Sequence, residues 1–437
     1  MTSFLVGTCL VQAFGTDASN PEIQAVLRHG GLRPDHVSTV GVSIAVMIVP
    51  VSVIVLAAVS SAAIAATTRD RARWRLAGAS PIALAVFVLT QIGVAALSGG
   101  LLGALATALG GGRLSELLNG MILPELAGID VHAAPMALAG AVLVPLVTTL
   151  FAATLPALRG ARVSAIRAVR GEDTPLSRNG VGRWMTTVLG LAALFAIVVA
   201  VYHHPPGLDN GEALTAGLGL AVLTLGVAGL GARILVPLVV SAVSRLLPVP
   251  SPLWPLAREG AVARVHVSGP TVVALACGSG ILGSITGMAR TSEAIARALG
   301  SQEEYNLLDT YIICAVIGLL CAVGGACVLA LSTGDRRREV AMLRAVGLSP
   351  WQVRGVAAAE ALLLSASTML IGLVTTVVST ALISRAAAMD GLPVRFVLPW
   401  AELSVSAVLT SVVLLAALVL PAHRALHASV RESLASE

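Results

Sequence analysis

The chain has 437 residues, of which 56% are hydrophobic and only 12% are charged, and its formal net charge is +5. Soluble globular proteins carry about 25% charged residues, so this composition excludes an ordinary soluble fold. Long apolar stretches recur along the chain, and a bilayer core needs about 20 apolar residues for each spanning helix. The sequence therefore predicts an all-α integral membrane protein with many spans.

Ten apolar stretches are candidate membrane helices. In chain order they cover residues 2–14, 40–66, 82–108, 134–158, 185–203, 211–233, 269–289, 308–332, 353–384 and 400–421. The first stretch is too short to cross about 30 Å of hydrocarbon at about 1.5 Å per residue. We expect this helix either to lack a piece at its start or to enter the membrane only partly.

The basic residues predict the orientation of these helices. All 28 are arginine, and alternating the loops from a cytoplasmic N-terminus places 21 of them inside. This bias follows the positive-inside rule, and the inverted topology violates it. We therefore expect a multi-pass membrane protein with both termini in the cytoplasm. Topology and anionic lipid explain the arginine clusters better than nucleic acid does.

An internal repeat divides the chain. Arg69–Pro81 (RDRARWRLAGASP) aligns without gaps to Arg338–Pro350 (REVAMLRAVGLSP), with six of 13 positions identical. Two unrelated basic loops are the alternative, but a shared Arg-x-x-Gly-x-Ser-Pro indicates common descent. We predict two parallel four-helix units at residues 1–170 and 251–437. Residues 171–250 supply a linker and two bridging helices.

The second copy of the repeat is expected to end one helix and begin another. Gly347 can adopt a positive φ and end a helix. Ser349 can cap the next helix, with Pro350 in its first turn and Gln352 at the capping-box position. The pattern therefore predicts helix, break and helix in that order.

The first copy carries the same pattern in a weaker form. Gly78, Ser80 and Pro81 are present, but Ala83 replaces the glutamine of the capping box. Each copy is expected to form a short amphipathic surface helix with arginines outward and Trp74 or Trp351 at the interface. Such a helix can bind a soluble partner. The alternative is a helix that lies on the membrane surface without a partner.

The segment Asp335–Leu364 (DRRREVAMLRAVGLSPWQVRGVAAAEALLL) resembles the hallmark segment of FtsX-like ABC transporter permeases, the family of the MacB, LolC/LolE and BceB types. In that family this segment joins two helices of each unit and contains the coupling helix that docks on the ATPase. The resemblance covers both units and is specific in the second. It implies ATPase-coupling roles for Arg344, Gly347, Ser349, Pro350, Trp351 and Gln352, with Arg75, Gly78, Ser80 and Pro81 as first-copy counterparts.

Ten helices in one chain resemble the BceB arrangement, which implies one permease acting as a pseudodimer with two ATPase subunits. The MacB and BceB types carry a large extracellular domain after the first helix of a unit. Here the corresponding loops, about 15–39 and 290–307, are too short for a folded domain. The substrates of those types therefore cannot be carried over directly.

The residue inventory places ATP binding outside this chain. A P-loop requires a lysine that reaches the phosphates, and the sequence contains no lysine. Either a partner ATPase binds ATP and Mg²⁺, as we expect, or ATP is not used. We expect a membrane permease subunit rather than an enzyme, without a cofactor or metal of its own.

Glu360 falls within a predicted span, and its counterpart in the first unit is Gln91. Charge inside a membrane is costly and usually functional. Glu360 is therefore either a polar contact that couples the two units or a proton site. The alternative places it at the cytoplasmic interface, solvated or paired with Arg354.

These features favour an ABC permease that exports or extracts a hydrophobic or amphipathic substrate by mechanotransmission. The candidate substrates are a lipid, lipopeptide, antimicrobial peptide or drug, and the expected partners are ABC ATPases and membrane lipids. One alternative is a transmembrane signal relay to an extracellular cell-wall enzyme, with Gly110–Ala133 as docking surface. A second is a proton-coupled secondary transporter that uses Glu360.

Overall fold

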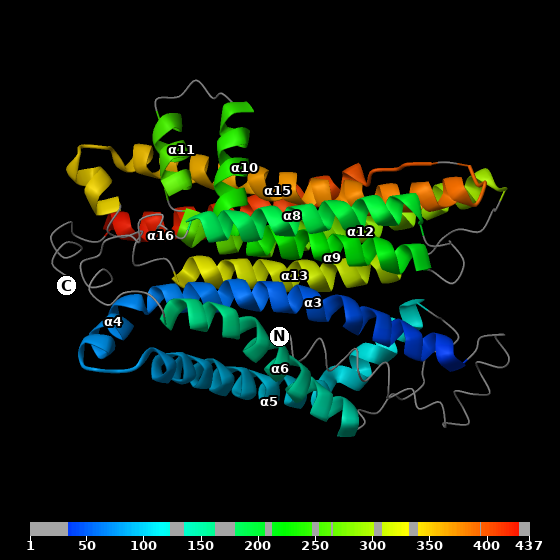
Figure 1. The fold of residues 1–437 in the computed structure, drawn as a ribbon, viewed down its shortest axis with the longest axis horizontal. Helices are drawn as coiled ribbons and strands as arrows, with labels where there is room; N and C mark the ends of the chain where they lie inside the picture. Colours follow the sequence, from blue (N-terminus) through cyan, green and yellow to red (C-terminus); the bar gives the residue numbers. More distant parts are fainter. Residues whose placement is uncertain are drawn as a thin grey trace. The chain divides into compact units, whose positions relative to one another are not determined.

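The computed structural model describes residues 34–122, 135–161, 180–205, 212–246, 253–263, 265–300, 308–331, 340–393 and 395–427. The regular elements in these ranges are helices (Figure 1). They are α3 (Pro34–Ala66), α4 (Thr68–Leu76), α5 (Pro81–Ile122), α6 (Pro135–Ala161), α8 (Gly180–His203), α9 (Glu212–Leu230), α10 (Ala232–Leu246), α11 (Trp254–Ala263), α12 (Val265–Ala298), α13 (Leu308–Leu331), α15 (Pro350–Met389) and α16 (Trp400–His427).

The prediction of an all-α membrane protein is confirmed. Within the described residues, seven helices are long and apolar enough to span a membrane, and the bent pair α9–α10 makes an eighth if it forms one span. The apolar part of α8, Thr187–His203, is shorter. Nine of the ten predicted spans correspond to described helices, while residues 2–14 lie outside the described ranges.

Helix α5 is longer than predicted. The predicted span ends at residue 108, whereas the helix continues through three glycines to Ile122. Leu114, Leu117 and Met121 recur at helical spacing beyond the glycines, which is the signal that the span-based prediction missed. The proposed docking surface at Gly110–Ala133 therefore begins inside a helix, and its residues 123–133 lie outside the described ranges.

The predicted span 211–233 ends earlier and is followed by an unpredicted helix. Helix α9 ends at Leu230, and α10 leaves it at an angle of 94°. A Cβ at Gly231 would lie 2.9 Å from Thr187 Cγ2 of α8. Glycine is required at this corner because the backbone approaches its neighbour so closely.

The chain forms two compact units. The first contains Met1–Ser60, Trp74–Val163 and Glu304–Leu320, and the second contains Ser61–Arg73, Ser164–Glu303 and Cys321–Glu437. In the first unit, α5 and α6 pack along each other. A Cβ at Gly100 would lie 3.3 Å from Val142 Cγ1, so small residues bring these helices close.

Helix α12 is the central helix of the second unit. It packs against α9, α10, α15 and α16, and 83% of its apolar window is buried. Helices α8, α9, α12, α15 and α16 run side by side, whereas α10 and α11 lie across them (Figure 1). Helix α15 has 40 residues and is therefore about 60 Å long, twice the thickness of the hydrocarbon core.

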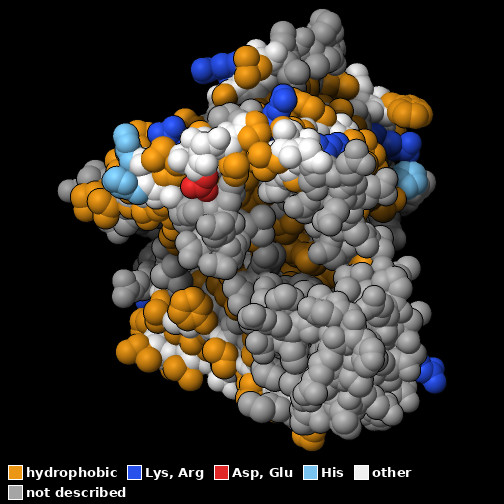
Figure 2. All heavy atoms as spheres, turned by 90° about the vertical axis from the view of Figure 1, so that its right-hand side faces the viewer, with side chains coloured by type: hydrophobic (Ala, Val, Ile, Leu, Met, Phe, Trp, Pro, Cys, Tyr) orange, Lys and Arg blue, Asp and Glu red, His pale blue; other side chains and the backbone are white. Residues whose placement is uncertain are grey.

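Large hydrophobic side chains cover much of the described surface (Figure 2). Helix α5 alone exposes Leu102 and Leu109, each by more than 65%. Exposed apolar side chains on this scale fit a surface that is solvated by lipid rather than by water.

Candidate functional site

The second copy of the repeat forms a tight helix break at Gly347. This residue has φ +98°, a conformation that costs glycine nothing and strains other residues. Gly347 N donates to Arg344 O at 3.0 Å, and Leu348 N donates to Leu343 O at 3.1 Å. These two bonds make a Schellman motif, which satisfies the last carbonyls of the preceding helical turn. Residues 340–345 before the break are helical.

The break passes directly into α15 through a complete capping box. Ser349 Oγ accepts a hydrogen bond from Gln352 N at 3.3 Å, and Ser349 N donates to Gln352 Oε1 at 2.8 Å. Pro350 occupies the first turn, where its missing N–H leaves no unpaired donor. The predicted order of helix, break and capped helix is confirmed.

The first copy forms the same break with half of the cap. Gly78 has φ +97°, Gly78 N donates to Arg75 O, and Ala79 N donates to Trp74 O, both at 3.0 Å. Ser80 Oγ accepts a hydrogen bond from Ala83 N at 3.2 Å. The methyl side chain of Ala83 cannot accept a hydrogen bond from Ser80 N, as Gln352 does from Ser349 N in the second break. The prediction of a weaker cap is confirmed.

A small hydrophobic core holds the second break against two membrane helices. Val340 before the break packs with Val353 and Ala357 of α15 and with Ala422 near the end of α16, and each is at most 4% exposed. Leu343, Leu348 and Val419 pack around this cluster. These contacts join the second break to both α15 and α16.

The first repeat segment departs from the predicted amphipathic helix. Four arginines and one aspartate are spread over the nine residues of α4, so its apolar residues do not gather on one face. Arg71 does not point outward: it is buried, and its Nε donates to Thr67 O at 3.2 Å. Burial lowers the pKa of Arg71. Trp74 packs edge-to-face against Phe87 of α5, with ring centroids 5.0 Å apart.

Both breaks expose apolar surface at equivalent positions. Ile82 and Trp351 each follow the Ser-Pro pair directly, and each is 77% exposed. Val346 beside the second break is 81% exposed. The other predicted residues lie on the same surfaces: Gly78, Ser80, Pro81, Gly347, Ser349, Pro350 and Gln352 are exposed, while Arg75 and Arg344 are half-buried.

The two predicted intramembrane polar residues lie in different surroundings. Glu360 on α15 is 1% exposed, which excludes the solvated alternative. Gln91 on α5 is exposed. The repeat therefore places a buried carboxyl in one copy and an exposed amide in the other.

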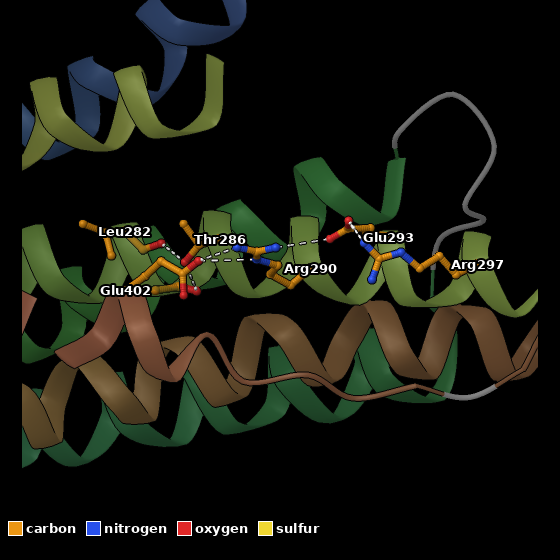
Figure 3. Close-up of polar contacts among 7 residues, drawn as sticks. Leu282, Thr286, Arg290, Glu293, Arg297 and Glu402 are labelled. Carbon is orange, nitrogen blue, oxygen red and sulfur yellow. Dashed lines mark hydrogen bonds and ion pairs between the residues drawn. The ribbon is translucent and has the colours of Figure 1, made fainter. Parts of the chain in front are cut away.

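A cluster of ion pairs joins α12 to the start of α16, and sequence reasoning missed it. Arg290 Nη2 lies 3.1 Å from Glu402 Oε1, and Arg290 Nη1 lies 3.5 Å from Glu293 Oε2 (Figure 3). Arg297 also pairs with Glu293. One helical turn before Arg290, Thr286 donates to Leu282 O at 2.7 Å. The signal in the sequence was Arg-x-x-Glu-x-x-x-Arg, whose spacing places all three charges on one helix face.

Removing Glu402 is expected to destabilise the second unit. Its side chain is 13% exposed, so Glu402→Ala leaves half-buried Arg290 without one of its charged partners. The expected loss is about 1 to 3 kcal/mol of unfolding free energy, measured by thermal unfolding in detergent. Glu259→Ala at an exposed position of α11 is the matched control and is expected to change little. Equal melting temperatures for the two variants would contradict the structural role of the pair.

A comparison with protein families identifies the chain. The model of the FtsX-like permease C-terminal domain matches residues 42–165 and 311–430, which together make up more than half of the sequence. No curated protein and no solved structure gives a significant match. The two matches contain both helix breaks, so the expected two-repeat organisation is confirmed. The chain is a multi-pass membrane protein of the FtsX-like permease family, whose members are permease components of ABC transporters that work with ATPase partners.

Proposed function

We propose that this permease couples ATP hydrolysis by two separate ATPase subunits to the export or extraction of a hydrophobic or amphipathic substrate. The first break (Gly78–Pro81) and the second break (Gly347–Pro350) each receive one ATPase on the cytoplasmic side. Both termini lie in the cytoplasm of a bacterial plasma membrane. Residues 1–170 and 251–437 form the two functional halves, joined by residues 171–250.

The exposed apolar surface at both breaks carries this proposal. Ile82 and Trp351 occupy equivalent positions and are equally exposed, beside positive-φ glycines of nearly identical backbone geometry. Exposed apolar patches rimmed by charge mark protein interfaces. The arginine distribution supports a position on the cytoplasmic side for these patches, within reach of a soluble ATPase.

Transmission of force follows from packing and length. The hydrophobic core around Val340 and Val353 links the second break to α15 and α16. Helix α15 then continues for about 60 Å, far enough to carry the displacement across the whole bilayer. At its far end, Ser384 Oγ donates to Arg395 O at 2.6 Å, which ties α15 to the segment before α16.

Co-expression with the ABC ATPases of the same genome tests the assembly. We expect native mass spectrometry of the purified permease to show two ATPases per chain. Arg344→Glu, which reverses a half-buried charge three residues before Gly347, is expected to remove one of them. Arg245→Glu at the exposed end of α10 reverses the same charge outside both repeat segments and should leave the ratio at two.

A folded permease that binds none of the ATPases contradicts the proposal. The loss of both ATPases from the Arg245→Glu variant would also contradict it, because a general effect of charge would then explain the Arg344 result. ATP turnover by the complex, with and without the permease, provides an independent readout of coupling.

A further inference from the structure

We propose that the second unit binds an anionic phospholipid in a groove between the start of α15 and the end of α16. The groove lies beside the second break and shares Trp351 with it, but the proposal stands whether or not the breaks receive an ATPase. The groove has a volume of about 550 Å³. Its lining residues are Trp351, Arg354, Gly355, Ala358, Leu415, Ala416, Val419 and Leu420.

The walls of the groove suit a hydrocarbon chain. Seven of the eight lining residues are apolar, and Leu420 is 54% exposed. Both helices are membrane-span candidates, and the groove lies at the ends of these spans. A groove of this volume, open along one side, is large enough for one acyl chain, whose methylenes each gain about 0.8 kcal/mol on burial.

One cation lies in this apolar groove and supplies the charge complementarity. Arg354 is one turn into α15, and its Nε is buried with no hydrogen-bond partner among the described residues. A buried donor without a partner costs free energy, so a side-chain movement that brings Nε to an oxygen ligand is favourable. No acidic residue is found among the described lining residues, so nothing there would hold the cationic end of a zwitterionic headgroup.

The guanidinium of Arg354 is oriented by an aromatic ring. Its Cζ lies 5.3 Å from the centroid of the Trp351 ring. A guanidinium that stacks on an aromatic face keeps its N–H edge available for bidentate contact with a phosphate. Tryptophan also favours the headgroup region of a bilayer, so Trp351 and Arg354 are placed at the depth of the phosphate groups.

The groove shares a wall with the core behind the second break. Val419 lines the groove and also packs against the cluster of Val340, Val353, Ala357 and Ala422. A bound acyl chain therefore presses on the same side chain that supports the break. Lipid occupancy is expected to stiffen this core and to make the permease sensitive to the anionic lipid content of its membrane.

The test uses the full chain, delipidated in a mild detergent and titrated with phosphatidylglycerol or phosphatidylcholine. Native mass spectrometry counts the bound lipids. We expect phosphatidylglycerol to bind with preference, and Arg354→Gln to weaken it roughly tenfold, as loss of a charge-assisted contact predicts. Ala416→Phe keeps the arginine, fills the groove at an exposed position and is expected to weaken binding similarly.

Arg385→Gln is the matched control, because it neutralises an arginine near the opposite end of the same helix. Its lipid binding should equal that of the wild type. Phosphatidylglycerol with brominated acyl chains should also quench tryptophan fluorescence, and Trp351→Phe should remove part of that quenching. If Arg354→Gln fails to fold, Ala416→Phe and the quenching still decide the question.

Three results would overturn the proposal. The first is equal binding of the two lipids by the wild type, since the arginine would then have no role. The second is displacement of the lipid by millimolar inorganic phosphate, which would mean a site for a free anion. The third is unchanged lipid binding in Ala416→Phe together with loss of an ATPase, which would assign the groove to the protein partner.

Discussion

Gly347→Val is expected to abolish binding of one ATPase while the membrane helices stay folded. Gly347 has φ +98°, and a Cβ there would meet nothing within 4 Å. The cost is therefore confined to the backbone, about 2 kcal/mol or more for a β-branched residue forced into this region. To relieve it the chain must straighten or shift the break, which removes the Schellman bonds and misplaces Trp351. Native mass spectrometry of the complex measures the result.

Gly347→Asn is the matched control at the same position. Asparagine tolerates positive φ far better than valine, so this variant should keep most of the ATPase binding although it adds a larger polar side chain. Equal loss in both variants would mean that the surface at Gly347, rather than its backbone conformation, matters. Equal retention would contradict the role of the break.

Gly283→Leu is expected to destabilise the second unit severely. A Cβ at Gly283 would clash with Thr376 Oγ1 of α15 and would lie 2.9 Å from Leu403 Cδ2 of α16. The Thr376 side chain has little room to move, because it is fully buried and its hydroxyl donates to Gly372 O at 2.9 Å. Forcing α12 away from both neighbours costs about 3 kcal/mol or more. Thermal unfolding in detergent should show a large fall in melting temperature or no folded protein.

Gly219→Leu controls for the change of residue type. Gly219 lies in the neighbouring helix α9, is exposed, and a Cβ there would meet nothing within 4 Å. The same substitution should therefore leave the melting temperature nearly unchanged, with leucine gaining contact with lipid or detergent. A mild effect at Gly283 would mean that the helices can separate easily, which contradicts a tightly packed α12.

Local chemistry made the breaks predictable from the sequence. Gly347, Ser349 and Gln352 each act within a few residues of themselves, so their types and spacing were enough to predict the positive φ and the capping box. Span positions were predictable for a similar reason, because hydrophobicity over about 20 residues reports membrane crossing directly. The span limits were less accurate, as α5 shows by continuing 14 residues past its predicted end.

Contacts between distant parts of the chain were not predictable in this way. Arg290 and Glu402 are 112 positions apart in the sequence. The residues around one of them do not identify the other as its partner. The burial of Arg71 depends on packing around α4. The basic sequence of Thr68–Leu76 does not predict it. The right-angled turn at Gly231 likewise depends on α8 lying against it. Tertiary packing decides each of these features.

The two breaks carry the same Schellman motif but unequal caps, one with a complete box at Ser349 and one with a single bond at Ser80. In an assembly of two identical chains, any mutation changes both halves at once. Here both halves belong to a single gene product, so each break can accumulate its own substitutions. The alanine at position 83, where the second break has Gln352, is one such asymmetry. Under the coupling proposed above, substitutions can adapt one half without altering the other.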